Sequence, residues 1–144
     1  MVIDSHVHCE YSYDGYDTVA DVCRAAHQQG VAVLTLTDHC DMRSHKHGYP
    51  FYFPIAERRW KEIEEAKGAF PTIKLLIGLE LGDVSNNVEL ARQHLQQYDY
   101  DFVLGSVHHI RDERNQRFEN LCPTDLVVAY LEEMDALVDF GAFD

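Results

Sequence analysis

Long apolar runs and basic stretches are both missing from this sequence of 144 residues. No segment reaches the roughly 18 apolar residues that a membrane-spanning helix needs, so we expect no membrane span. The segment from Met1 to His6 lacks the basic and apolar parts of a secretory signal peptide and instead predicts a β-strand. With 46% hydrophobic and 26% charged residues, the composition indicates one globular domain over residues 1–144.

Paired cysteines and an excess of positive charge are absent as well. The four cysteines form no C-x-x-C pair and suggest no disulfide framework, so we expect reduced thiols in a cytoplasmic protein. Only 12 lysines and arginines stand against 25 acidic residues, which gives a net charge of −13. This charge repels polyanions and disfavours a broad nucleic-acid surface. It still permits a small phosphorylated substrate, because bound divalent cations reverse the charge locally.

Short apolar runs alternate with longer amphipathic ones along the chain. The short runs predict strands at Val2–His8, Val31–Asp38, Lys74–Leu81 and Phe102–Val107. The longer runs predict helices at Thr18–Gln29, Ile55–Ala69, Asn87–Gln97 and Thr124–Phe140. Such alternation is typical of βαβ units with a parallel sheet.

Helical spacing also predicts which helix residues are buried. In the last predicted helix we expect one buried face, made by Val127, Tyr130, Leu131, Met134, Leu137 and Val138. The histidines within helices, His27 and His94, are expected at the surface.

Each predicted strand carries a metal-ligand residue type near its C-terminal end. Alternation along a strand places His6 and His8 on one face of the first strand. The other strands end with His39, Glu80 and His108. Because the C-terminal ends of parallel strands lie side by side, these side chains are expected to converge on one rim. Imidazoles with a carboxylate suit Zn²⁺, Mn²⁺ or Fe²⁺. A single such histidine is usually a hydrogen-bonded core residue, but the repetition over four strands favours a metal site.

Neighbouring polar residues are less clearly assigned. Asp38 and His109 point away from the adjacent ligand residues, which favours supporting or loop roles. Asp14 precedes a glycine, so a plain turn and metal ligation remain equally compatible with the sequence. For Cys9 and Cys40, which each follow a ligand histidine, packing is favoured over ligation.

These motifs, taken in order, resemble a known family. They are His6-Val7-His8, Asp14-Gly15, Thr37-Asp38-His39, Gly78-Leu79-Glu80 and Ser106-Val107-His108-His109. Their order and spacing resemble the PHP (polymerase and histidinol phosphatase) family, and within it the histidinol-phosphatase branch. The resemblance implies a distorted (β/α)7 TIM-like barrel, of which this chain supplies the N-terminal four βα units.

The resemblance also implies up to three divalent metals. His6, His8 and Glu80 would hold one metal, and Glu80 would bridge to a second that His108 also binds. Asp14 and His39 would hold a third. The family's later Gly-His and Asp-x-His motifs are not found, so we expect a C-terminally truncated domain that binds metal weakly and is nearly inactive. Its open sheet edge would favour self-association.

For the intact protein we expect phosphomonoester hydrolysis, with histidinol phosphate of histidine biosynthesis as substrate. A metal-bridging hydroxide would attack phosphorus in line. His109 is a candidate proton donor to the leaving group, and Arg111 or Arg114 a candidate for neutralising the phosphate.

Three other functions share parts of this pattern. A phosphodiesterase or exonuclease of the same family would use the same chemistry, but the net charge and the lack of an aromatic-basic groove disfavour it. A non-catalytic metal-binding domain is compatible with truncation. A metal-dependent amidohydrolase usually has a lysine ligand, and no predicted strand ends in lysine.

Overall fold

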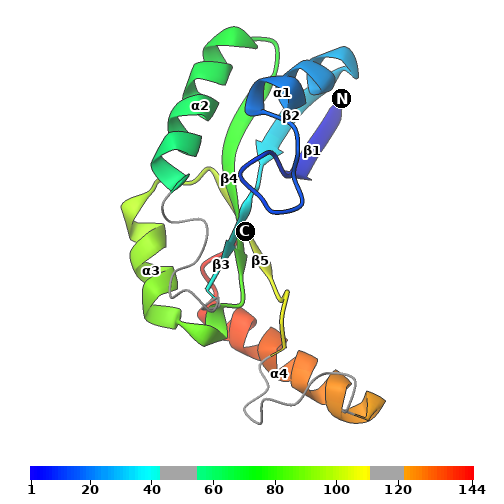
Figure 1. Ribbon diagram of the computed structural model, residues 1–144, viewed down its shortest axis with the longest axis vertical. Coiled ribbons are helices and arrows are strands. Elements are labelled where there is room, and N and C mark those ends of the chain that lie inside the picture. Colours follow the sequence, from blue (N-terminus) through cyan, green and yellow to red (C-terminus); the bar gives the residue numbers. More distant parts are fainter. Residues whose placement is uncertain (43–54, 111–121) are drawn as a thin grey trace.

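A computed structural model describes residues 1–42, 55–110 and 122–144 (Figure 1). The predicted alternation of strands and helices is confirmed. In chain order the elements are β1 (Val2–Val7), α1 (Val19–Gln28), β2 (Val31–Leu36), β3 (His39–Asp41), α2 (Ala56–Ala69), β4 (Lys74–Gly82), the 3-10 helix η2 (Val84–Asn86), α3 (Val88–Gln97), β5 (Phe102–Ser106) and α4 (Pro123–Phe140). Among these described segments, no helix combines the length and apolar character needed to cross a bilayer.

The sheet is parallel throughout, in the order β1, β2, β4 and β5. The short strand β3 pairs with β4 beyond the end of β2, so β2 and β3 lie along the same side of β4. Neighbouring strands thus follow sequence order, as in a barrel of βα units. The described chain forms part of a TIM-like barrel, as predicted.

The second predicted strand, Val31–Asp38, is interrupted. Regular pairing stops at Leu36 and resumes at His39. The two intervening residues bond toward β1 and the segment after it, while the carbonyl of Asp38 still accepts from the backbone N–H of Glu80 on β4 at 3.1 Å. Thr37 donates its backbone N–H to the carbonyl of Val7 at 2.8 Å. The buried carboxylate of Asp38 accepts from the backbone N–H of Cys9, also at 2.8 Å. His39 therefore begins a new strand instead of ending the old one.

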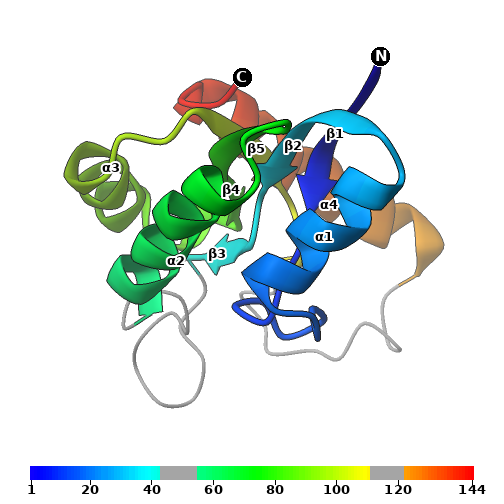
Figure 2. The same ribbon diagram turned by 90° about the horizontal axis from the view of Figure 1, so that it is seen from above.

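Helices α1, α2 and α3 cover one face of the sheet, as Figure 2 shows. The alternate β4 residues Leu75, Ile77, Leu79 and Leu81 are buried on that face. Leu75 and Ile77 pack with Cys23 of α1 and Ile63 of α2. Leu79 and Leu81 belong to a second cluster with Ala91 of α3 and Leu137 of α4. The opposite, inner face of β4 carries Glu80 between two glycines, Gly78 and Gly82.

Helix α4 does not bury the face that its sequence predicts. Of the six expected residues, Leu137 is buried and Met134 is half-buried, but Val127, Tyr130, Leu131 and Val138 are exposed. The reason is that α4 packs on the sheet through its C-terminal end and extends away from it at the other (Figure 1). Leu137 lies so close to β5 that a Cβ at Gly105 would be 3.1 Å from its side chain.

The two helix histidines differ from each other. His27 is exposed, as expected. His94 is only 1% exposed, so the prediction of a surface position was wrong for it. Its Nε2 lies 2.8 Å from the hydroxyl of Tyr100, and its ring packs beside Tyr98. This hydroxyl partner and the aromatic surroundings make a buried histidine acceptable on α3.

Candidate metal centre

The inner face of β4 provides the centre of the site. Glu80 lies between Leu79 and Leu81, which point into the helix-covered core, so alternation directs its carboxylate to the opposite side. On the neighbouring strand β3, His39 is the register partner of Glu80. The carboxylate is only 4% exposed although no arginine or lysine is recorded as its ion-pair partner in the described part of the chain.

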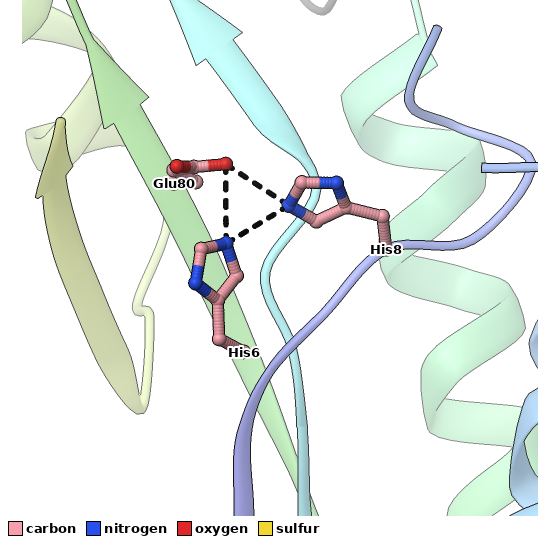
Figure 3. A group of neighbouring side chains, drawn as sticks. All are labelled: His6, His8 and Glu80. Atoms are coloured by element: carbon pink, nitrogen blue, oxygen red, sulfur yellow. Dashed lines mark hydrogen bonds and ion pairs between the residues drawn. The ribbon is translucent and has the colours of Figure 1, made fainter. Parts of the chain in front are cut away.

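Three imidazoles surround one oxygen of Glu80. Its Oε2 lies 2.9 Å from His8 Nε2, 3.4 Å from His6 Nε2 and 3.1 Å from His39 Nδ1. Figure 3 shows His6 and His8 reaching this carboxylate from β1 and the segment that follows it. Neither Glu80 Oε2 nor His39 Nδ1 has a hydrogen-bond partner within the described residues, although both are buried. These atoms meet at short distances without the directionality of hydrogen bonds.

The other oxygen of Glu80 is directed to β5. Its Oε1 lies 3.0 Å from Nε2 of His108, which follows the end of that strand. The same Nε2 lies 2.8 Å from the hydroxyl of Ser106. Glu80 thus has one oxygen near β1 and β3 and one near β5, and His39, Glu80 and His108 form a second group of ligand atoms.

Asp14 completes a third group. Its Oδ1 lies 3.0 Å from His8 Nδ1, and its Oδ2 lies 3.4 Å from His39 Nε2. Gly15 makes this approach possible, because a Cβ at that position would lie 2.0 Å from the carbonyl oxygen of Cys9. From the sequence, Asp14 could be either a turn residue or a metal ligand. In the structure it lies in a turn and its carboxylate is also within reach of His8 and His39.

The charges within the site are strongly coupled. Burial alone would raise the pKa of Glu80, but the hydrogen bond from His108 and the nearby imidazoles lower it to about 2. Burial alone would lower the pKa of His108, but the carboxylates of Asp41 and Glu80 raise it to about 10. The pKa of Asp14 is likewise lowered, because His8 and His39 outweigh its burial. In the metal-free protein, a protonated His108 therefore supplies positive charge next to Glu80.

These residues fit a metal ion. Glu80 Oε2 and His39 Nδ1 are buried 3.1 Å apart without a hydrogen-bond partner within the described residues, and a cation bound between them would satisfy both. The three groups that can each hold an ion are His6, His8 and Glu80; His8, Asp14 and His39; and His39, Glu80 and His108. Together they contain all six residues that were predicted as ligands. Nitrogen-rich sets of this kind suit Zn²⁺ and other transition metals.

A buried network positions the loop that carries these ligands. Asp38 accepts from the hydroxyl of Ser12 at 2.8 Å and from Arg59 Nε at 2.6 Å. Burial alone would raise the pKa of Asp38, but the charge of Arg59 and the hydrogen bonds hold it below its usual value. Ser12 in turn accepts from the backbone N–H of His39 at 3.1 Å. As predicted, Asp38 does not point toward the ligand groups but holds the backbone next to them.

The two cysteines that follow ligand histidines pack instead of joining the ligand groups. The thiol of Cys9 faces Asp38, and Cys40 is buried in the core.

His109 pairs with a carboxylate that the sequence did not single out. Its Nδ1 lies 2.7 Å from Asp83 Oδ2, and the other oxygen of Asp83 accepts from the backbone N–H groups of His108 and His109. Asp83 is buried and has a positive φ of 55°. Arg111 and Arg114 lie outside the described residues.

Three functional residues were missed from sequence: Asp41, Asp83 and Arg59. Asp41 follows His39 by two positions, so strand alternation was a usable signal, but the predicted strand ended before it. Asp83 lies beyond the end of β4, and Arg59 reaches the site from α2. Nothing in the local pattern distinguishes these two from ordinary surface charges.

Known proteins with similar sequences include histidinol-phosphatases. The histidinol-phosphatase of Lactococcus lactis subsp. lactis is 30% identical over 118 residues, which are 76% of this chain and 40% of that protein. The probable histidinol-phosphatase of Clostridium acetobutylicum is 28% identical over 108 residues, covering 75% of this chain and 40% of that protein. The chain thus spans about 40% of the length of the curated relatives that it matches.

A solved structure has a similar fold. It is the crystal structure of histidinol phosphate phosphatase from Lactococcus lactis subsp. lactis, complexed with zinc, L-histidinol and phosphate. The TM-score is 0.66 at 28% sequence identity, with 77% of this chain and 41% of that chain covered. Residues 4–143 of the present chain match the PHP domain. Because this match extends over nearly all of the sequence, the chain belongs to the PHP domain family.

Proposed function

We propose that this chain carries the metal-dependent active site of a phosphomonoester hydrolase, with histidinol phosphate as the substrate. The observation that carries the proposal is the position of Glu80, whose buried carboxylate connects two groups of ligand atoms on the inner face of the sheet. The zinc, L-histidinol and phosphate of the Lactococcus structure support the choice of metal and substrate by similarity.

In this proposal, His6, His8 and Glu80 would hold one cation. Glu80 and His108 would hold a second cation, and Asp14 with His39 would hold a third. Zn²⁺, Mn²⁺ and Fe²⁺ all accept such ligands. Bound cations would supply Lewis-acid polarisation of the phosphate and an activated water at neutral pH. The net charge of −13 opposes the binding of a phosphate ester, and bound cations would reverse the charge locally.

We propose that a protein side chain delivers a proton to the leaving alcohol. His109 is the proposed donor, and Asp83 holds the Nδ1 side of its ring at 2.7 Å. Because Asp83 engages Nδ1, Nε2 is the nitrogen through which His109 can pass a proton to the leaving oxygen. Arg111, close behind in the sequence, is proposed to neutralise the phosphate oxygens.

Metal content and substrate choice test this function together. The chain is dialysed against Zn²⁺ or Mn²⁺, and its bound metal is measured by elemental analysis. Phosphate release is then measured from histidinol phosphate, p-nitrophenyl phosphate and a short oligonucleotide, at protein concentrations that detect slow turnover. We expect release from both phosphomonoesters and none from the oligonucleotide.

Two variants locate the activity. Glu80→Gln removes the shared charge and should lose both metal and phosphate release. Glu132→Gln removes an equal charge from the exposed surface of α4 and should change neither. Full metal content and activity in Glu80→Gln would overturn the assignment. Metal binding without hydrolysis of either monoester would instead indicate a non-catalytic metal-binding domain.

A further inference from the structure

Asp41 contacts the ring of His108 from the side opposite to Glu80. Its Oδ1 lies 2.6 Å from His108 Nδ1, while Nε2 of the same ring lies 3.0 Å from Glu80 Oε1. The two side chains are well shielded, at 9% exposed for Asp41 and 16% for His108. Asp41 belongs to none of the three groups that can hold a metal ion in the described part of the chain.

The register of the sheet brings these residues together. Asp41 on β3 is the partner of Gly82 on β4, and Gly82 is the partner of Ser106 on β5. Two residues earlier along the same strands, His39 is the partner of Glu80. Asp41 and Ser106 therefore flank a glycine in the next row on the same face of the sheet as the metal-ligand row.

The absence of a side chain at Gly82 gives the pair its space. A Cβ at this position would lie 1.9 Å from Asp41 Oδ1 and 2.7 Å from His108 Nδ1. Gly82 has no positive φ, so its backbone conformation does not require glycine. The requirement comes instead from the carboxylate and the imidazole that occupy the volume above it.

We propose that Asp41 is a positioning residue that fixes the orientation and tautomer of His108, so that Nε2 is the nitrogen presented to a cation beside Glu80. A ring that binds a metal through Nε2 carries its proton on Nδ1, and Asp41 is the acceptor for that proton. A carboxylate in this role fixes the ring and makes its ligating nitrogen more basic. The inference rests on the metal assignment of the proposed function and adds a residue that this assignment does not contain.

Asp83 has a separate role in placing His108. It accepts from the backbone N–H of His108 at 2.8 Å. Asp83 therefore sets the position of the main chain, whereas Asp41 sets the rotation of the imidazole. Loss of Asp41 should leave the fold intact and change how the cation is coordinated.

Cobalt binding tests this inference without relying on catalysis. Metal-free wild-type, Asp41→Ala and Asp41→Asn proteins are titrated with Co²⁺, and the visible absorption bands report affinity and coordination geometry. We expect Asp41→Ala to lower the affinity of one Co²⁺ by about 10- to 100-fold and to alter its absorption bands. Asp41→Asn keeps an acceptor oxygen for Nδ1–H and should restore a large part of that affinity.

Two further variants separate positioning from general effects. Asp139→Ala removes the same charge from the exposed surface of α4 and should bind Co²⁺ like the wild type. Gly82→Ala keeps both partners but fills the space between them, so it should reproduce the altered bands of Asp41→Ala. Thermal unfolding of each metal-free protein checks that the fold is retained.

The outcomes distinguish this inference from the proposed function. Wild-type affinity and spectrum in Asp41→Ala would overturn the positioning role while leaving the metal site in place. If the wild type bound no Co²⁺, both would fail. If the Co²⁺ spectra of the wild type and Asp41→Ala differed as expected but the wild type released no phosphate from any ester, the inference would stand and the phosphatase proposal would fall.

Discussion

Arg59 Nε donates to Asp38 Oδ2 at 2.6 Å, and neither side chain is exposed to solvent. The guanidinium also donates through Nη2 to the carbonyl oxygens of Leu36 at 2.7 Å and Gly78 at 3.0 Å. One residue of α2 therefore ties together the end of β2, the middle of β4 and the corner that leads into His39. This contact connects the packing of the outer helices to the geometry of the inner face.

Loss of the guanidinium should destabilise the fold strongly. Arg59→Met leaves the carboxylate of Asp38 buried without its cation, which typically costs about 3–5 kcal/mol in the free energy of unfolding. Urea unfolding of the metal-free chain measures the change. Arg58→Met is the matched control, because Arg58 is 69% exposed and its contacts are a surface ion pair with Glu62 and the ring of Tyr11, so its loss should have little effect. Similar losses in the two variants would contradict the importance of the buried pair.

The strand ligands could be predicted because their signal is local. The alternation of side chains along a strand, and a ligand residue near the end of each strand, can be recognised in the sequence without tertiary information. Parallel pairing then brings the strand ends together, as the register of His39 with Glu80 illustrates. The helices between strands were recognisable for the same reason, since their caps and breakers, such as Gly30 after α1 and Pro123 at the start of α4, are local signals.

The parts that could not be predicted depend on tertiary contacts. Arg59 is one of two consecutive arginines on a helix, and only the folded chain shows which one faces Asp38. The apolar period of α4 indicates an amphipathic helix but does not say what packs on it, and most of the predicted face is exposed. His94 was wrongly assigned to the surface. Its partner Tyr100 lies beyond the end of α3, so the helical pattern alone does not show that the two side chains meet.

Two glycines should respond in opposite directions to alanine. At Gly78, a Cβ would lie 2.6 Å from Thr35 Cγ2 and 2.9 Å from the carbonyl oxygen of Leu36, so Gly78→Ala should destabilise the fold by about 1–3 kcal/mol. At Gly68, within α2, a Cβ would meet no atom within 4 Å other than its chain neighbours and the adjacent backbone of its own helix. Gly68→Ala should stabilise by about 0.5–1 kcal/mol, because glycine is unfavourable inside a helix. Urea unfolding of both variants checks the signs, and a stable Gly78→Ala would show that the inner face has spare room.

His94 should make the fold sensitive to mild acid. Burial lowers its pKa to about 4, whereas an unfolded histidine titrates near 6.5. Its contribution is therefore complete above pH 6.5 and is lost as pH falls toward 4, by up to about 3 kcal/mol. Unfolding free energies of the metal-free chain between pH 7 and 4.5 measure this loss. His94→Gln should flatten the profile, whereas His27→Gln, at an exposed position, should leave it unchanged. A wild-type slope in His94→Gln would assign the acid sensitivity to other groups.

The proposed role of His109 predicts a dependence on the leaving group. An alkoxide leaving from histidinol phosphate needs a proton, whereas p-nitrophenolate leaves readily without one. His109→Gln should therefore lower kcat for histidinol phosphate by about 10²- to 10⁴-fold and affect p-nitrophenyl phosphate far less. Asp83→Asn should shift activity in the same direction, because Asp83 holds the ring at Nδ1. Equal losses on both substrates would point to a structural or metal-related role for His109.

Metal binding should displace a proton from His108. In the metal-free protein, Asp41 and Glu80 outweigh burial and raise its pKa to about 10, so the ring is protonated at pH 7.5. A metal ligand must be neutral, and binding therefore releases this proton. Affinity should accordingly increase as pH rises toward 10 and change little above it.

Calorimetric titration with Zn²⁺ in buffers of different ionisation enthalpy counts the released protons. His108→Gln should release about one proton fewer per chain than the wild type at pH 7.5, whereas His27→Gln should match the wild type. Glu80, with a pKa of about 2, is already ionised and contributes no proton at this pH. An unchanged count in His108→Gln would mean that His108 is neutral before the metal arrives, and that the charge next to Glu80 comes from another imidazole.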